Sequence, residues 1–402
     1  MFVENRDIKC FTSVIEQQAI DQINAMLLSP VGENSKVRIM PDVHAGTGCT
    51  IGTTMTITDK IVPSIVGVDI GCGMFVVKLP SFADECLNRV DLAAHFVPSG
   101  FNTWHRKLYD FDLKELRCYE HLENIDRIEC SIGTLGGGNH FIEIDRNEAT
   151  DELYLVIHSG SRNLGVQVAK YYQDLAYQRL KKDDYSDAVK KLVDGLKAEG
   201  RKEEIAGELK RLKATYKAEL LPHDLCYLTG DDMKDYLHDM RVCQLYAKVN
   251  RQMIARVMLD IACLGYLDDY ESFHTVHNYI DLDHMIIRKG AVSAMEGERL
   301  LIPINMRDGS LLCIGKGNSD WNFSAPHGAG RIMSRAEAKR TITEQAYRES
   351  MNGIYSSTVN LSTIDEAPMA YKRIEDIVDN IEPTVTVNAI LKPIYNFKAG
   401  EE

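Results

Sequence analysis

The pattern of apolar and polar residues divides the chain into stretches that differ in composition and in the spacing of their apolar residues. Residues 37–40, 53–57 and 74–78 form short β-rich runs that are separated by glycines. A second stretch of this kind spans residues 131–158, where the apolar run 153–157 leads directly into His158. We therefore expect strands joined by tight turns in both stretches, with polar side chains at the strand ends.

The stretch 164–264 is instead rich in Lys, Glu, Asp, Leu, Ala and Tyr at helical spacing, most strongly over residues 187–219. This pattern predicts a mainly helical subregion with a protruding helical pair, broken near Gly200 and again at residues 221–224. The charge runs within it are most simply explained as solvated helix faces.

Short β-rich runs separated by glycines appear again after Tyr266 and continue to Gly330. A helix over residues 334–353 and a terminal stretch with both helix and strand are predicted to follow. The helical subregion thus separates two blocks rich in Gly and His. Any site that uses both blocks must be assembled from parts that are distant in sequence.

Composition narrows the class of protein. The chain has 402 residues, 45% of them hydrophobic, and only 11 prolines, so it can bury a large core and disorder is a poor interpretation. The formal net charge of −13 argues against broad, nonspecific adhesion to nucleic acid but leaves room for a local basic groove.

Cysteine usage and the N-terminal residues indicate the compartment. The ten cysteines include no tight pair, which favours reduced thiols over a disulfide framework. The chain begins with no basic stretch followed by an apolar one, and no window approaches 18 apolar residues. We expect a soluble cytoplasmic protein that does not enter a membrane.

The first candidate for chemistry lies at Asp69 and Cys72, which are flanked by Gly67, Gly71 and Gly73. A carboxylate and a thiolate three residues apart on a glycine turn can chelate a metal, and a thiolate can bridge two metals. A glycine turn that merely buries a thiol would explain the same residues.

The second candidate follows a triple glycine, where Asn139 and His140 precede Glu143. The glycine backbone can approach a phosphate closely, and His140 offers a metal-binding imidazole. A structural histidine with satisfied hydrogen bonds is the alternative. His158, at a predicted strand end, stands near Arg162, whose guanidinium suits a phosphate; a ligand and a structural role are equally good interpretations there.

The C-terminal block adds further histidines. His274, His277 and His284 cannot share one helix face, so we expect only one or two of them to reach a site. The cationic run 288–289 either contacts phosphates or forms an ordinary basic turn. His327 stands among small residues, which leaves space for a ligand or for a group bound covalently to the imidazole.

Taken together and in order, these motifs closely resemble those of RtcB-type RNA-splicing ligases, from about Pro41 to the C-terminus. The matching segments are Pro41-Asp42-Val43-His44-x-Gly46-x-Gly48, Gly67-Val68-Asp69-Ile70-Gly71-Cys72-Gly73, Gly136-Gly137-Gly138-Asn139-His140-Phe141-Ile142-Glu143, His158-Ser159-Gly160-Ser161-Arg162, His277-Asn278, Arg288-Lys289-Gly290-Ala291, Ser324-x-x-His327-Gly328-Ala329-Gly330-Arg331 and Asp365-Glu366-Ala367-Pro368-x-Ala370-Tyr371-Lys372. The resemblance implies an α+β fold in which a central β-rich body holds the site and helices surround it. It also implies one catalytic domain over residues 1–402, with 164–264 as a helical subregion.

The resemblance implies a centre of two manganese ions. Cys72 would bridge them, Asp69 and His140 would complete the protein ligands of one ion, and His158 and His277 would complete those of the other. His327 would be the nucleophile that takes GMP from GTP. The guanylylated histidine would then activate an RNA 3′-phosphate, or an opened 2′,3′-cyclic phosphate, for joining to a 5′-hydroxyl end.

The same resemblance assigns binding roles. GTP would contact Asn139, Glu143, His327, Tyr371 and Lys398, while Asp42 and Arg162 would serve RNA-end binding or the later steps. The implied partners are RNA and GTP, in tRNA splicing or RNA repair. Two alternatives remain on the sequence: a noncatalytic RNA-binding paralogue, which the presence of Cys72 and His327 disfavours, and a two-metal phosphoesterase without a covalent nucleotide.

Overall fold

A computed structural model describes residues 2–216 and 221–399 of the chain. Its strands are β1 (Ile8–Cys10), β2 (Val37–His44), β3 (Ile51–Thr56), β4 (Gly73–Leu79), β5 (Phe141–Asn147), β6 (Glu152–Ser159), β7 (Ser272–Val276), β8 (Asn278–Asp281), β9 (Ile286–Lys289), β10 (Ala291–Ser293), β11 (Arg299–Asn305), β12 (Gly309–Gly315), β13 (Ser324–Pro326) and β14 (Val385–Lys398). Its α-helices are α1 (Gln17–Leu28), α2 (Pro63–Val66), α3 (Leu87–Phe96), α4 (Ile125–Glu129), α5 (Arg162–Ala198), α6 (Ile205–Thr215), α7 (Gly230–Ala262), α8 (Arg335–Thr341), α9 (Glu344–Ser350) and α10 (Ile374–Ile381).

The largest sheet has seven strands in the order β11-β12-β14-β5-β6-β4-β7, and every neighbouring pair is antiparallel. Its two edges approach each other, because the backbone N–H of Leu301 in β11 donates to Oγ1 of Thr275 in β7 at 3.0 Å. The sheet is therefore nearly closed. Side chains on its inner face come from strands that lie far apart in the sequence.

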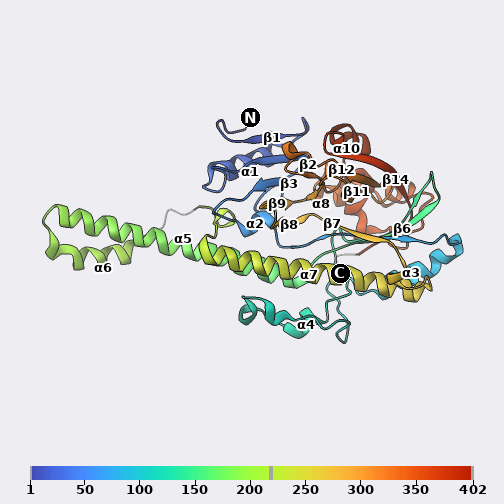
Figure 1. Cartoon of the computed structure of the whole chain (residues 1–402), viewed down its shortest axis with the longest axis horizontal. Helices are drawn as coiled ribbons and strands as arrows, with labels where there is room; N and C mark the ends of the chain where they lie inside the picture. The colour runs from blue at the N-terminus through green and yellow to red at the C-terminus, as the bar shows by residue number, and fades with distance from the viewer. Residues whose placement is uncertain (1, 217–220, 400–402) are drawn as a thin grey trace.

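A five-stranded sheet, in the order β1-β2-β3-β9-β8, packs beside this body. Only its β1–β2 pair is parallel. A short ladder joins β10 to β13, and β13 leads directly into His327. Segments from both halves of the chain thus meet around one centre (Figure 1).

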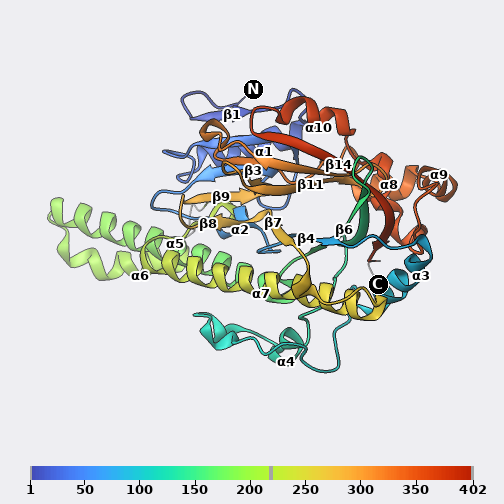
Figure 2. The same cartoon turned by 45° about the vertical axis from the view of Figure 1, so that its right-hand side comes forward.

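Two long helices, α5 and α7, run along one side of the β-rich body, and the outer part of α5 projects from it together with α6 (Figures 1 and 2). Gly200, with φ of +76°, ends the long α5 segment, and Pro222 precedes the short turn before α7. Within the described residues, helices α5, α6 and α7 make up most of the stretch 164–264, and they are interrupted near Gly200 and before α7. Its Lys and Glu side chains between residues 187 and 213 are exposed or half-buried, as expected for solvated faces.

Helix α7 packs against the body with both apolar and polar residues. Ile254, Ala255 and Met258 join a core cluster that includes Phe75 and Ile157 of the sheet. The same helix also buries Asp239, Asn250 and Arg251 completely or almost completely. Burying polar groups this deeply is costly unless each forms hydrogen bonds, so these residues must hold nearby backbone in place.

The α+β class expected from the sequence is confirmed, as are the strands predicted around residues 37–40, 53–57, 74–78 and 153–157. One prediction was wrong: residues 334–353 form two short helices, α8 and α9, rather than one. The chain turns extended at Ile342 and Thr343, and the Thr343 side chain caps α9 by accepting from the backbone N–H of Ala346. No helix in the described part of the chain has the length and apolar composition needed to span a membrane.

Candidate active site

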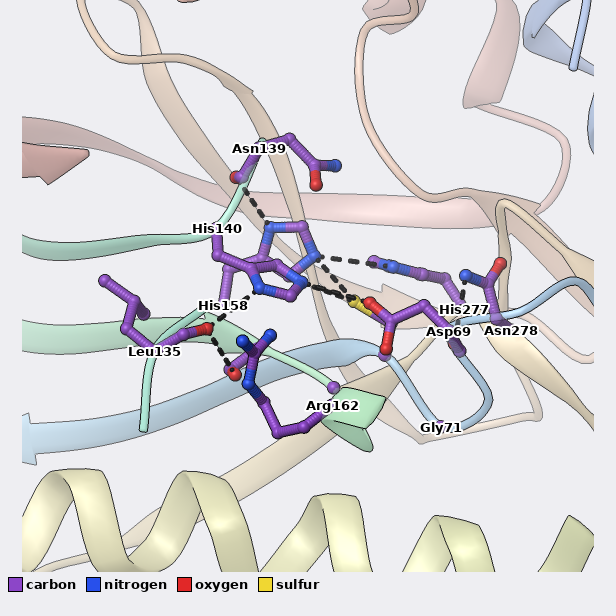
Figure 3. Close-up of polar contacts among 12 residues, drawn as sticks. Asp69, Gly71, Leu135, Asn139, His140, His158, Arg162, His277 and Asn278 are labelled. Carbon is purple, nitrogen blue, oxygen red and sulfur yellow. Dashed lines mark hydrogen bonds and ion pairs between the residues drawn. The ribbon is translucent and has the colours of Figure 1, made fainter. Parts of the chain in front are cut away.

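Two groups of possible metal ligands share one sulfur atom. Asp69, Cys72 and His140 form the first group, and Cys72, His158 and His277 form the second. The Cys72 sulfur lies 3.4 Å from Nε2 of His140 and 3.2 Å from Nε2 of His158. Figure 3 shows the imidazoles and the Asp69 carboxylate converging around this sulfur. All five side chains that the sequence assigned to metals are brought together.

A tight turn places Asp69 beside Cys72. The Cys72 N–H donates to the Asp69 carbonyl at 3.2 Å, and Gly71 occupies the third position of the turn with φ of +74°. A left-handed residue at that position favours glycine. A side chain at Gly71 would also meet the Cα of Gln244 in α7 at 2.9 Å. The glycine-flanked motif is thus required by both conformation and packing.

The imidazoles are oriented through their second nitrogens. Nδ1 of His140 lies 2.9 Å from the Leu135 carbonyl, and Nδ1 of His158 lies 3.2 Å from the Asn139 carbonyl (Figure 3). A carbonyl only accepts, so each Nδ1 carries a proton, and Nε2 is the nitrogen of each ring that faces Cys72 and would bind a metal ion. Backbone contacts of this kind typically orient histidines that bind metals.

The surroundings of these side chains decide their protonation states and so whether they can bind a metal. Burial, reinforced by neighbouring cationic groups, lowers the pKa of His158 and His277 well below the usual value, so both imidazoles are neutral. Burial opposes ionisation of Asp69, but its hydrogen bond to His140 and the charge there outweigh burial and lower the Asp69 pKa to about 2. Burial and the Asp69 charge raise the pKa of Cys72. A divalent cation would reverse that last effect by stabilising the thiolate.

The donor set fits first-row transition metals. It combines one thiolate, three imidazoles and one carboxylate, whereas magnesium or calcium sites use oxygen donors almost exclusively. His140 and Asp69 approach to 3.1 Å, and the Nε2 atoms of His158 and His277 approach to 3.4 Å. Because Nδ1 of His158 carries the proton, its Nε2 can only accept, either from His277 or by binding a cation that both Nε2 atoms face, so the residues fit a metal centre.

Helix α7 supports this arrangement from below. Oδ1 of Asn250 accepts from the N–H groups of Gly133 and Thr134, and its Nδ2 donates to Thr134, Ser159 and Gly160. Arg251 donates to the carbonyls of Gly71 and Ser159 at 2.7 and 2.8 Å. The two side chains therefore tie together the loops that carry the possible ligands.

His327 lies beside the second group of ligands. Its ring centre is 4.9 Å from that of His277 in an edge-to-face arrangement. Oδ2 of Asp42 lies 2.6 Å from Nδ1 of His327 and accepts the His327 backbone N–H at 3.1 Å. Asp42 itself is 0% exposed, so it lies behind His327 and has no surface to offer an RNA end directly.

A cavity of about 470 Å³, here called the histidine cavity, opens next to His327. It lies among residues that are distant in sequence, and the side chains relevant to chemistry are Asn139, Glu143, His158, His277, His327, Arg331, Arg335, Glu366, Tyr371, Asn396 and Lys398. The structure thus gathers every residue that the resemblance assigned to GTP. The volume is in the range of sites for small organic ligands.

Glu143 lines the histidine cavity and is paired with Asn396. Nδ2 of Asn396 donates to Glu143 at 2.6 Å, across the β14–β5 pairing in which these two residues face each other. Burial raises the pKa of Glu143 to about 7, although Asn396 and the charge of Lys398 act in the opposite direction. The Glu143 carboxyl therefore changes charge near neutral pH.

Glu366 also lines the histidine cavity and organises several of its side chains. It accepts from the Tyr371 hydroxyl at 2.6 Å and from Lys398 Nζ at 3.2 Å, and it pairs with Arg331 at 3.2 Å. Burial alone would raise its pKa, but the charges of Lys398 and Arg335 and the Tyr371 hydrogen bond lower it to about 2. Tyr371 and Lys398 are consequently held in fixed positions beside the cavity.

Sequence reasoning did not assign roles to Glu366, Asn396, Arg331 and Arg335. Glu366 and Arg331 stand within the quoted motifs, so their place in those motifs could have marked them as site residues. Asn396 carried none, because its position opposite Glu143 follows from strand register.

Several cationic and histidine candidates lie elsewhere. His274 stacks on Phe75, and His284 is exposed and contacts Asp281, so only His277 of the three reaches the ligand groups, in agreement with the prediction. Arg288 is buried and bonded to Ser324, Tyr279 and Asp281, which identifies it as structural.

Arg162 lies on the Asp69 side of the site. Its guanidinium donates to Thr134 Oγ1 and to the Gly100 carbonyl, and it occupies the space that a side chain at Gly136 would fill. One role of the triple glycine is therefore to make room for Arg162.

Comparison with known proteins finds relatives along most of the chain. A family model described as tRNA-splicing ligase RtcB matches residues 23–120 and 113–399. The chain is 29% identical to the RNA-splicing ligase RtcB of Escherichia coli strain K12, over 96% of this chain and 97% of that protein. It is 30% identical to an RNA-splicing ligase RtcB1 from another Escherichia coli strain, with the same coverage. A tRNA-splicing ligase RtcB from Aeropyrum pernix is 27% identical over 84% of this chain and 82% of its own length.

Proposed function

This chain belongs to the RtcB family and is an RNA ligase, and we propose that it joins RNA 3′-phosphate or 2′,3′-cyclic phosphate ends to 5′-hydroxyl ends through a guanylylated His327. GTP is the co-substrate, and two manganese ions are the cofactors. The substrates are cleaved RNAs of tRNA splicing or RNA repair, which present these ends.

The metal proposal rests on the sulfur of Cys72, which belongs to both ligand groups. Asp69 and His140 would hold one ion with it, and His158 and His277 would hold the other. Bound manganese would offset the negative charge of the phosphates and orient them for displacement.

The single observation that carries the proposal is the pairing of Asp42 with His327. Because Asp42 accepts the proton on Nδ1, the lone pair of His327 resides on Nε2 and is available as a nucleophile. In the first step Nε2 forms a bond to the α-phosphorus of GTP, and the bond to the bridging oxygen breaks to release pyrophosphate. The Asp42 carboxylate balances the positive charge that the imidazole acquires in this step.

The histidine cavity supplies the binding site for GTP. Glu143, when ionised, can accept both donors on the Watson–Crick edge of guanine, which adenine does not present in that arrangement. Tyr371 offers a ring for the base, Lys398 offers a donor to it, and Asn139 lies where phosphates would approach His327. Arg331 and Arg335 add positive charge along the same wall.

Two further displacements complete the reaction. An oxygen of the RNA 3′-phosphate attacks the phosphorus of GMP, and the bond to Nε2 breaks so that His327 is regenerated. The 5′-hydroxyl of the second strand then attacks the activated RNA phosphate, forms the phosphodiester and releases GMP. A 2′,3′-cyclic phosphate must first be opened by water to a 3′-phosphate.

The test is incubation of the protein with [α-³²P]GTP and manganese, followed by strand joining with 3′-phosphate, 2′,3′-cyclic phosphate and 3′-hydroxyl ends. We expect protein-bound label, and joining of the first two kinds of end only. Label on His327→Ala would refute the covalent mechanism. Phosphate-ester hydrolysis by wild-type protein without label would instead identify a phosphoesterase, and RNA binding without either reaction a noncatalytic paralogue.

A further inference from the structure

A second cavity adjoins Asp69 and shares no lining residue with the histidine cavity. Its volume is about 830 Å³, and we call it the arginine cavity because Arg127 and Arg162 line it together with Asp69, Phe101 and Val166. Asn102, Thr103, Asn124 and Asn163 add neutral polar groups. Two guanidinium groups against one carboxylate that belongs to the metal ligands leave a positive balance, which suits a phosphate.

The arginine cavity is connected to the reactive histidine. A cavity of about 470 Å³ lies between the two, sharing Asp69 and Val166 with the arginine cavity and His277 and His327 with the histidine cavity. A chain that enters past Phe101 can therefore continue past Asp69 toward His327.

Phe101 has the largest exposed fraction among the large apolar side chains of residues 2–216 and 221–399. It is 78% exposed, and it stands at the edge of the arginine cavity beside Val166, which is also exposed. A single exposed apolar side chain is ordinary on a protein surface, but this ring borders a cavity lined by two arginines, where a base can stack while its phosphate is bound.

The turn that carries Phe101 is firmly anchored. The N–H of Asn102 donates to the Ser99 carbonyl, and Gly100 in the turn donates to Gly136 at 2.9 Å. The Gly100 carbonyl accepts from Arg162, and the Phe101 carbonyl accepts from Arg127. The same two arginines that line the cavity thus fix the backbone beneath the ring, and the ring needs little ordering before it binds a ligand.

We propose that the terminal base of an RNA end stacks on Phe101, with its phosphate near Arg162 and Arg127, and that this contact places the end beside Asp69. The ligand is an unpaired terminal nucleotide, because unstacked bases pair readily with aromatic side chains regardless of sequence. Phe101 acts as a positioning residue for the RNA and leaves GTP untouched. This inference rests on the proposed ligase function.

The decisive experiment is a double-mutant cycle that combines a substitution at Phe101 with removal of the terminal base of the RNA. Manganese-loaded wild type and Phe101→Ala are titrated with short single strands ending in a 3′-phosphate or a 5′-hydroxyl, each made with a normal or an abasic terminal nucleotide. We expect Phe101→Ala to bind one of the normal ends about 10-fold or more weakly. Removing that terminal base should weaken wild type by a similar factor and leave Phe101→Ala unchanged. The affected strand identifies which end occupies the cavity.

Further variants separate stacking from general apolar contact. Phe101→Trp should retain wild-type affinity, whereas Phe101→Leu should behave like Phe101→Ala. Tyr266→Ala is the matched control, because Tyr266 is an aromatic residue of similar exposure, 76%, that lines none of the three cavities. Uptake of label from [α-³²P]GTP should be the same in all four variants and wild type, which shows that the fold and the first reaction step are intact.

Equal affinity of wild type and Phe101→Ala for both normal ends would overturn the proposal. The exposed ring would then be a candidate contact for a protein partner instead. Equal losses on normal and abasic strands would also overturn it, since the base would then play no part. Absence of label in wild type would refute the proposed function instead, so the two failures are distinguishable.

Discussion

Oδ2 of Asp42 lies 2.6 Å from Nδ1 of His327 and also accepts the His327 backbone N–H, so one buried carboxylate fixes both the ring and the chain at this histidine. In the neutral ring, a carboxylate partner places the proton on Nδ1 and the lone pair on Nε2. In the proposed mechanism, the reactivity of His327 therefore depends on a residue with no exposed surface.

The Asp42–His327 pair predicts two different losses. His327→Ala should abolish protein-bound label from [α-³²P]GTP. Asp42→Asn should reduce the rate of labelling about 100-fold or more, because an amide can donate to Nδ1 and so favour the wrong tautomer. His105→Ala, which changes an exposed histidine, is the control. A normal labelling rate in Asp42→Asn would show that Asp42 only supports the fold.

The shared sulfur predicts how metal content changes. Cys72→Ala should lose nearly all bound manganese, because Cys72 belongs to both ligand groups, whereas His277→Ala should lose about half. Metal content after dialysis, measured by atomic absorption, checks this. Cys313→Ala removes a buried thiol far from the ligand groups in sequence and should keep the wild-type content. If Cys72→Ala and His277→Ala lost the same amount, the bridging role would be wrong.

The raised pKa of Glu143 predicts a pH dependence of GTP binding. Guanine offers donors to this group, so the ionised carboxylate binds it and the protonated form does not. As pH falls through about 7, GTP affinity should decrease by up to about 10-fold per pH unit, and above that pH it should level off. Calorimetric titration between pH 6 and 8 measures this, with Glu143→Gln expected to lose both the slope and the preference for GTP over ATP.

A pair of glycines tests the position of Asp69. A Cβ at Gly160 would lie 2.1 Å from Oδ1 of Asp69, whereas one at Gly195 in α5 would meet nothing within 4 Å. Gly160→Ala should therefore weaken manganese binding by roughly 10- to 100-fold, by displacing a possible ligand. Gly195→Ala should leave metal binding unchanged and stabilise its helix by up to about 1 kcal/mol. Equal manganese affinity in the two variants would contradict the assignment of Asp69.

Asn250 predicts a loss of stability. Asn250→Ala would leave the N–H groups of Gly133 and Thr134 without their buried acceptor. The cost should be roughly 3 kcal/mol or more, since each unsatisfied buried group costs about 1–3 kcal/mol. Thermal melting should show a clear decrease, while Asn380→Ala on exposed α10 should not. A melting temperature unchanged in Asn250→Ala would mean that solvent replaces its contacts.

Local pattern was enough to predict much of the fold. The spacing of apolar residues shows directly which side of an element is buried. It was sufficient to predict the glycine-separated strands β2, β3 and β4 and the long charged helices. The helix predicted over 334–353 was wrong because residues 342–343 carry a helix end and a new cap, and nothing in the surrounding periodicity reveals a break that two residues produce.

The candidate site was predictable residue by residue only where a motif marked it. Asp69, Cys72 and His327 stood in such motifs, and the structure brings them to one centre. Asn396 and the placement of Asp42 behind His327 depend on strand register and on packing between distant segments. Those relationships are tertiary, and local spacing carries no information about them.

Strand β14 follows every other strand along the chain, yet it lies in the middle of the seven-stranded sheet, between β12 and β5. During synthesis on the ribosome, β5 and β12 must therefore wait as unpaired edges until β14 emerges. Because β14 also carries Asn396 and Lys398 into the histidine cavity, a chain interrupted before this strand has no complete cavity and exposes two strand edges that favour aggregation. Premature termination should thus yield insoluble protein rather than a partly active enzyme that consumes GTP.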